Sequence, residues 1–143
     1  MRVTKTYDDL LELKAAGLVA SSDHSHDSAG TRIILDLGTG DVEGDIIIDV
    51  TACEVDSGNE IYEIGAQISD SSTMGSGIYE VCTLKLGDAV AIPGDTDMGI
   101  GRYVLPFQNR IVNGTAKRYL QIYTTVTGTI GTGINFAAYL AKK

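Results

Sequence analysis

The side chains best suited to chemistry lie in the pentapeptide Asp23-His24-Ser25-His26-Asp27, which contains both histidines of the chain. Imidazole and carboxylate groups are ligands of zinc and of other divalent ions. In an extended segment His24 and His26 point to the same side, as a shared ion would require. The flanking sequence offers no evident hydrogen-bond partners that would orient the ligands. We therefore favour a solvated polar segment and expect no cofactor, and we keep His24 and His26 as candidate metal ligands.

Other polar groups give weaker indications of chemistry. Asp41, Glu43 and Asp45 alternate in a glycine-containing turn, and this spacing could bind calcium, but it lacks the full EF-hand pattern. A solvated acidic turn is the simpler interpretation. Neither histidine lies near a candidate nucleophile, and the carboxylates give no evident pair for acid–base catalysis. We do not expect an enzyme.

Composition excludes several classes of partner. The chain has 143 residues and a formal net charge of −8, so phosphate repulsion disfavours nucleic acid as a partner. No run approaches the roughly 18 apolar residues of a membrane span. The N-terminus lacks the apolar region of a signal peptide, so we expect synthesis in a reducing cytoplasm, with Cys53 and Cys82 as buried thiols.

The elements that would position these groups are mostly strands. Alternating apolar and polar residues mark strands with one buried face, and seventeen glycines favour tight turns between them. No long helix is indicated, so we expect an all-β, jelly-roll-like antiparallel sandwich over residues 31–143. Ile47 interrupts the alternation of its strand, which indicates burial on both faces or contact with another subunit. The expected strands are residues 31–37, 45–55, 62–69, 78–86, 101–107, 118–127 and 133–141, with a short edge strand at 89–92.

The last two expected strands are joined by a linker rich in glycine and threonine, and we interpret them as a β-hairpin. Leu120 and Phe136 belong to the apolar faces of this hairpin, and Tyr119, Tyr123 and Tyr139 belong to the opposite faces. Tyrosine is enriched at protein contacts. The outward tyrosines therefore indicate a subunit interface or a sugar-binding platform, beside the simpler alternative of cross-strand packing.

The first thirty residues differ from the rest, and we interpret them as an extended N-terminal arm. Residues 7–17 could form a short helix that ends at Gly17, and residues 21–30 are expected to be an exposed polar loop or an extended arm. The sandwich is expected to fold without this arm. Apolar residues of the arm that could contact another subunit or a partner are Tyr7, Leu10, Leu11 and Leu13.

Three stretches, taken in order, resemble the capsid cement (decoration) proteins of tailed bacteriophages, known from a short-tailed Bordetella phage. The likeness extends from about residue 31 to the C-terminus, and its most specific part is the Arg-Tyr-Leu segment with its Thr-Val-Thr-Gly-Thr tail. The stretches are residues 33–38 with Gly44 and residues 46–50; Leu105-Pro106-Phe107 after Gly101-Arg102; and residues 117–129 with Gly133 and residues 134–140.

The resemblance implies a jelly-roll sandwich that forms a homotrimer. Such trimers bind the major capsid protein on the outside of the virion, at three-fold and quasi-three-fold positions, and stabilise the expanded shell after synthesis in the bacterial cytoplasm. The arm has no clear equivalent in the family. The alternative function is a carbohydrate-binding module or a phage-fibre head on a similar sandwich, motivated by the outward tyrosines and the acidic turn.

Overall fold

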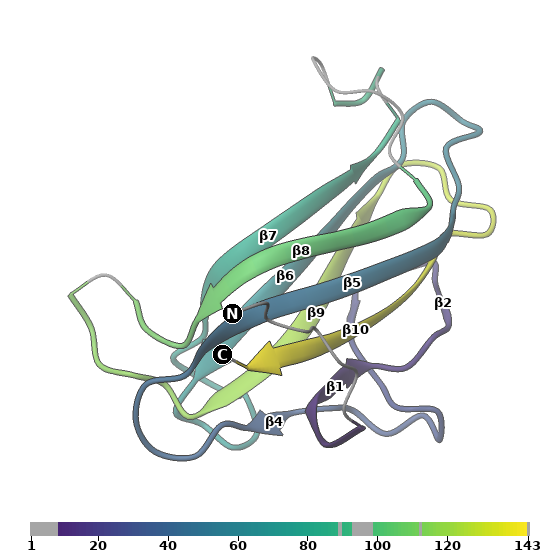
Figure 1. The fold of residues 1–143 in the computed structure, drawn as a ribbon. Coiled ribbons are helices and arrows are strands. Elements are labelled where there is room, and N and C mark those ends of the chain that lie inside the picture. The colour runs from purple at the N-terminus through teal and green to yellow at the C-terminus, as the bar shows by residue number, and fades with distance from the viewer. Residues whose placement is uncertain (1–8, 89, 93–98, 112, 143) are drawn as a thin grey trace, which may run out of the picture.

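The computed structural model describes residues 9–88, 90–92, 99–111 and 113–142, and these residues form two antiparallel sheets packed face to face (Figure 1). The expected all-β sandwich is confirmed. One sheet has the order β1-β10-β5-β8, with β2 also paired to β10, and the other has the order β3-β9-β6-β7, with β4 also paired to β9. The bounds in the first sheet are β1 (Glu12–Lys14), β2 (Leu18–Val19), β5 (Glu43–Cys53), β8 (Gly101–Gln108) and β10 (Ile134–Lys142).

The second sheet contains two short strands from the first part of the chain and three long ones. Its bounds are β3 (Asp23–His24), β4 (Leu35–Asp36), β6 (Ile61–Ser69), β7 (Tyr79–Gly87) and β9 (Tyr119–Thr127). The strand expected at 31–37 is thus reduced to β4. Residues 90–92 of the expected edge strand are turn and bend, and residue 89 lies outside the described part of the chain. No helix in the described residues is long and apolar enough to cross a membrane.

The core lies between the sheets and follows the alternation read from the sequence. Ile46 and Ile48 of β5, Ile64 of β6, Leu120 of β9 and Phe136 of β10 are all fully buried. β-Branched and aromatic side chains suit these positions because they pack well on a pleated surface. Burial of apolar area between the two sheets is therefore the main stabilising contribution to this fold.

The two C-terminal strands do not form the expected hairpin. β9 pairs with β6 in one sheet, and β10 pairs with β5 in the other, so residues 128–133 cross between the sheets. The alternation of apolar and polar residues identifies the buried face of a strand. Two successive strands show the same alternation whether they pair in one sheet or belong to two sheets packed face to face. The Glu54 carboxylate accepts hydrogen bonds from the backbone N–H groups of Gly131, Thr132 and Gly133 at 2.6–3.0 Å, which fixes the crossing.

The first described residues differ from the expected helix. Asp9–Leu11 form a single 3₁₀ turn, and β1 follows at once and pairs with β10. Leu13 is fully buried in the core, Leu11 packs against the core, and Leu10 is 82% exposed. The spacing of the leucines is compatible with a helix and also with a turn that leads into a strand. The hydrogen bonds that residues 12–14 form with β10 favour the strand. Tyr7 lies outside the described residues.

Lys14 ends β1 in a buried position. Its ammonium group donates hydrogen bonds to the carbonyl oxygens of Ala15, Gly17 and Phe136 at 2.7–2.9 Å and lies 4.5 Å from the centre of the Phe136 ring. Burial lowers the pKa of Lys14 to about 8. The three hydrogen bonds offset the cost of burying this charge. The bond to the Phe136 carbonyl also joins the N-terminal segment to β10.

Candidate functional site

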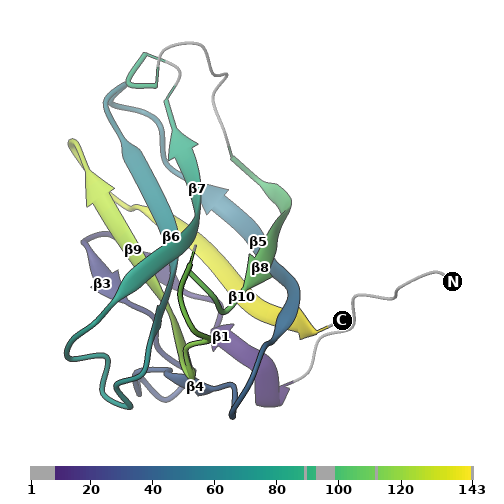
Figure 2. The same cartoon turned by 90° about the vertical axis from the view of Figure 1, so that its left-hand side faces the viewer.

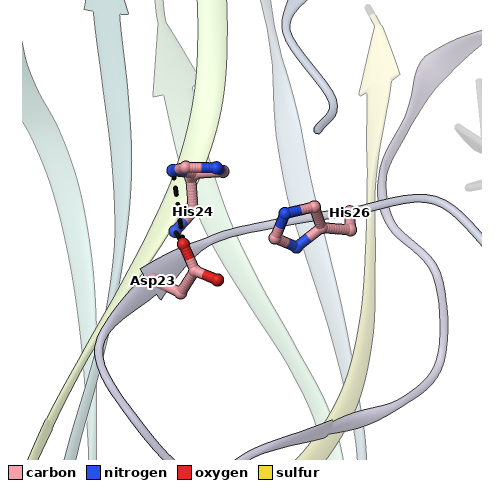
Figure 3. A group of neighbouring side chains, drawn as sticks. All are labelled: Asp23, His24 and His26. Atoms are coloured by element: carbon pink, nitrogen blue, oxygen red, sulfur yellow. Dashed lines mark hydrogen bonds and ion pairs between the residues drawn. The ribbon is translucent and has the colours of Figure 1, made fainter. Parts of the chain in front are cut away.

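Asp23, His24 and His26 come together at the edge of the second sheet (Figure 3). Within the described residues they form the one group of three histidine, cysteine or carboxylate side chains whose ligand atoms all lie within 4.8 Å of one another. Asp23 Oδ1 is 3.3 Å from His24 Nδ1, and the two imidazole centroids are 5.0 Å apart. The structure thus brings the two candidate ligands together and adds Asp23, which the sequence pattern contained but did not single out.

The backbone of this cluster is held on both sides. β3 pairs with β9, so that His24 lies opposite Tyr123, and the Ser25 N–H continues the ladder to the Ile122 carbonyl at 3.1 Å. His26 forms a bridge with Arg32, and its carbonyl accepts the Ala15 N–H at 3.1 Å. The expected exposed loop at 21–30 is therefore wrong for residues 23–26, because main-chain partners were available that residue types alone do not reveal.

The electrostatic surroundings favour a neutral imidazole at His24. Burial lowers the pKa of His24, the Arg32 charge adds to this effect, and the Asp23 carboxylate opposes it. Arg32 is directed to Gln121 Oε1 at 2.6 Å, and Gln121 in turn donates to Gln67 Oε1 at 2.7 Å. Neutral imidazole is the form that ligates metal ions. The arrangement can bind a cation, whereas it offers no activated nucleophile.

The acidic turn does not assemble a calcium site within the described residues. Asp41 forms an ion pair with Arg110 at 2.6 Å, and Glu43 accepts a hydrogen bond from Gln108 at 3.2 Å. These side chains and Asp45 do not belong to the group of close ligand atoms. The carboxylates of Asp41 and Glu43 instead fasten the start of β5 to the end of β8, which is an ordinary role for surface charges near strand ends.

Two of the interface candidates are buried within the chain itself. Ile47 and Tyr139 lie opposite each other in the β5–β10 ladder, on the face away from the core cluster, and they are 0% and 3% exposed. Ile47 therefore confirms burial on both faces of its strand. Neither side chain has surface left to offer a partner.

The three outward tyrosines do not share one surface. Tyr119 and Tyr123 are half-buried in β9, and Tyr139 belongs to β10 in the other sheet. The expected hairpin would have placed all three side by side, so a platform that includes Tyr139 is not formed. Tyr119 and Tyr123 stay candidates for a subunit contact on the second sheet.

The edge strands β7 and β8 lie side by side (Figures 1 and 2), and a groove that the sequence did not indicate is lined by residues of both. Its volume is about 620 Å³, and Tyr79, Glu80, Phe107, Arg110 and Ile111 are among its lining residues. Among the described residues each of these strands pairs with a neighbouring strand on one side only, as expected of sheet edges. One available signal was Pro106 within β8, since proline inside a strand marks an edge.

An ion pair joins two of the stretches on which the family resemblance depends. Arg118 Nε and Nη2 donate to the two carboxylate oxygens of Asp36 at 2.8 and 2.9 Å, and the Leu37 N–H donates to the Arg118 carbonyl at 2.8 Å. Leu35 of β4 lies opposite Leu120 of β9. The hydrogen bonds from Arg118 hold the pKa of Asp36 at about 2. We call this contact the Asp36–Arg118 clamp.

A scan of the chain against protein-family models finds no match, and a search of curated proteins finds no match either.

Proposed function

We propose that this chain is a structural virion protein, a homotrimeric capsid cement protein that binds the outside of an icosahedral phage shell. Its partners are then the major capsid protein and two further copies of itself, at three-fold and quasi-three-fold positions. Three identical subunits on a symmetric shell turn weak single contacts into tight binding, because each later contact is intramolecular. The role would be to stabilise the expanded shell.

The Asp36–Arg118 clamp is the observation that carries this proposal. The stretches 33–38 and 117–129 are remote in sequence, yet β4 and β9 lie side by side and the clamp ties them together. Two of the stretches that carry the resemblance are thus neighbours in space, and this contact supports the proposal.

Two further motif residues occupy positions that the fold restricts. Gly44 lies between β10 and β8, where an added Cβ atom would be 2.4 Å from the Ala141 carbonyl oxygen. Pro106 lies in the edge strand β8, opposite Asp45, where the missing N–H costs no ladder hydrogen bond to a further strand. Both positions support a likeness that reflects shared architecture.

Several surfaces are available for contacts with the shell or between subunits. Tyr79 and Val104 are 44% and 40% exposed on the edge strands β7 and β8, and Tyr119 and Tyr123 lie on the second sheet. Leu10 is exposed near the N-terminal turn. The carbohydrate-binding alternative has less support, because its tyrosines are divided between sheets and its acidic turn is paired with β8.

Co-sedimentation of the purified chain with phage capsids before and after expansion tests the proposal. We expect binding to expanded shells that saturates at three chains per three-fold site, and a trimer in sedimentation velocity. The double variant Tyr79→Ala, Val104→Ala asks whether strands β7 and β8 take part, and Thr39→Ala, at an exposed position outside the strands, is its control. Absence of binding to both forms of the shell would refute the cement role.

A further inference from the structure

We propose that Asp23, His24 and His26 form a binding site for one Zn²⁺ ion, a function separate from attachment to a capsid. The cluster contains every histidine of the chain, and its three side chains come from one short stretch at the free edge of β3. Two imidazoles and one carboxylate are a common donor set for zinc, with a fourth position open to water.

The spacing of two of the ligand atoms already suits tetrahedral zinc. Two ligands bound at about 2.0–2.1 Å and at the tetrahedral angle lie roughly 3.4 Å apart. Asp23 Oδ1 and His24 Nδ1 are 3.3 Å apart. One ligand atom of His26 lies within 4.8 Å of a ligand atom of Asp23 and of His24, and the position of its ring nitrogens can adjust by rotation about χ2, a broad and soft torsion. Figure 3 shows the His26 ring next to the Asp23–His24 pair.

The surroundings limit the movement that binding requires. The backbone of residues 23–26 is bonded to β9, to Ala15 and to residues 32 and 33, so the Cα positions of the ligands are fixed before an ion arrives. Asp23 Oδ1 also accepts the His24 backbone N–H at 2.8 Å, which orients the carboxylate. The conformational entropy lost on binding the ion therefore comes mainly from the His26 side chain.

Two nearby cations among the described residues would oppose the ion: Arg32, and Lys14, which lines the same pocket as the three ligands but is hydrogen-bonded to backbone carbonyls. The Arg32 guanidinium is bound to Gln121 Oε1, and its charge acts on His24. A Coulomb repulsion of this kind weakens binding without removing a ligand. We therefore expect Arg32→Gln to bind Zn²⁺ several-fold more tightly than the wild type, because the variant lacks this positive charge. Loss of a ligand should instead weaken binding.

Isothermal titration of the full chain with Zn²⁺ tests the site, on protein made without a polyhistidine tag and stripped with a chelator. We expect one ion per chain. His24→Asn and His26→Asn should each weaken binding by at least tenfold, and Asp56→Asn, which removes an exposed carboxylate elsewhere, should leave it unchanged. No saturable binding by the wild type, or equal binding by the wild type and both histidine variants, would overturn the proposal.

Nuclear magnetic resonance of the wild type gives a test that does not depend on the folding of variants. The chain has two histidines, so the imidazole signals are few and can be assigned. Both sets of ring signals should change together and stop changing at one equivalent of Zn²⁺. Ring signals that stay fixed through the titration would disprove the site. The result is independent of capsid binding, so the two proposals fail separately.

Discussion

At the scale of single residues, the Asp36–Arg118 clamp makes stability depend on acidity. Asp36 has a pKa of about 2 in the folded chain, against about 3.9 for an unperturbed aspartate. Since the folded pKa is the lower one, the ionised carboxylate stabilises the fold fully above about pH 4, and this contribution is lost as the pH falls through 2. The clamp should therefore be inactive in strong acid.

The measurement is urea unfolding of the wild type and of Asp36→Asn between pH 2 and pH 6. The difference in free energy of unfolding between the two proteins should be largest near pH 6 and should shrink towards pH 2. Asp56→Asn is the matched control, because Asp56 is exposed and has no ion pair among the described residues. A difference that stays constant with pH would show that the carboxylate charge does not stabilise the fold.

Leu10 and Leu13 are three residues apart, yet one is exposed and the other belongs to the core. Leu13 is fully buried, so Leu13→Ala should lower the free energy of unfolding by about 2–5 kcal/mol through lost burial and a residual cavity. Leu10 is 82% exposed, and Leu10→Ala should change it by less than about 0.5 kcal/mol. Chemical denaturation of both variants gives the values. Similar small effects would mean that Leu13 contributes little to the core.

At the scale of elements, the loop between β9 and β10 depends on glycine. Gly133 has φ +101°, and an added Cβ atom would be 2.2 Å from the Val19 carbonyl oxygen. Gly30 has φ +85° with no atom within 4 Å of that position. Gly30→Ala should therefore cost only the strain of a left-handed residue, about 1–2 kcal/mol. Gly133→Ala adds a backbone clash and should cost clearly more.

Thermal unfolding of Gly30→Ala and Gly133→Ala, side by side, measures this difference. The melting temperature of Gly133→Ala should fall well below that of Gly30→Ala. Equal losses would indicate that β2 moves away from β10 without cost, and would contradict the close packing described between Val19 and Gly133.

The long strands could be predicted from the sequence, and their partners could not. The alternation around Ile46, Ile64, Leu120 and Phe136 located β5, β6, β9 and β10 to within a few residues. A period of two records which face is buried, and it carries no information on which sheet a strand joins. The terminal hairpin was wrong for this reason, and with it the shared surface of the three tyrosines.

The short elements and the site were predicted less well, for a related reason. Strands of two or three residues, such as β3, are too short to show a period, so pairing with β9 decides their conformation. The relation between His24 and His26 was predictable because it is local and follows from the geometry of an extended chain. The burial of Tyr139 was missed because its neighbour Ile47 is remote in sequence.

At the scale of the whole molecule, the first strands belong to both sheets. β1 and β2 pair with β10, and β3 pairs with β9. Removal of residues 1–28 would uncover the edges of β9 and β10 and would delete Leu13 from the core. We therefore expect the fragment 29–143 to be insoluble or poorly folded, in contrast to the independent sandwich that the sequence indicated.

Expression of 29–143 beside the full chain, followed by circular dichroism and a melting curve of the soluble fraction, tests this expectation. A soluble fragment with a cooperative transition close to that of the full chain would show that the first strands are dispensable.

The central place of β10 also sets an order of events during synthesis. β10 lies between β1 and β5, and it is the last strand of these 143 residues to leave the ribosome. Until then Ile46, Ile48 and Val50 of β5 lack their ladder partners in β10, and both flanking strands present unpaired backbone. Nascent chains that stop short of residue 134 therefore carry exposed apolar strands, which chaperones and proteases recognise. Only chains that extend through β10 can close the sandwich.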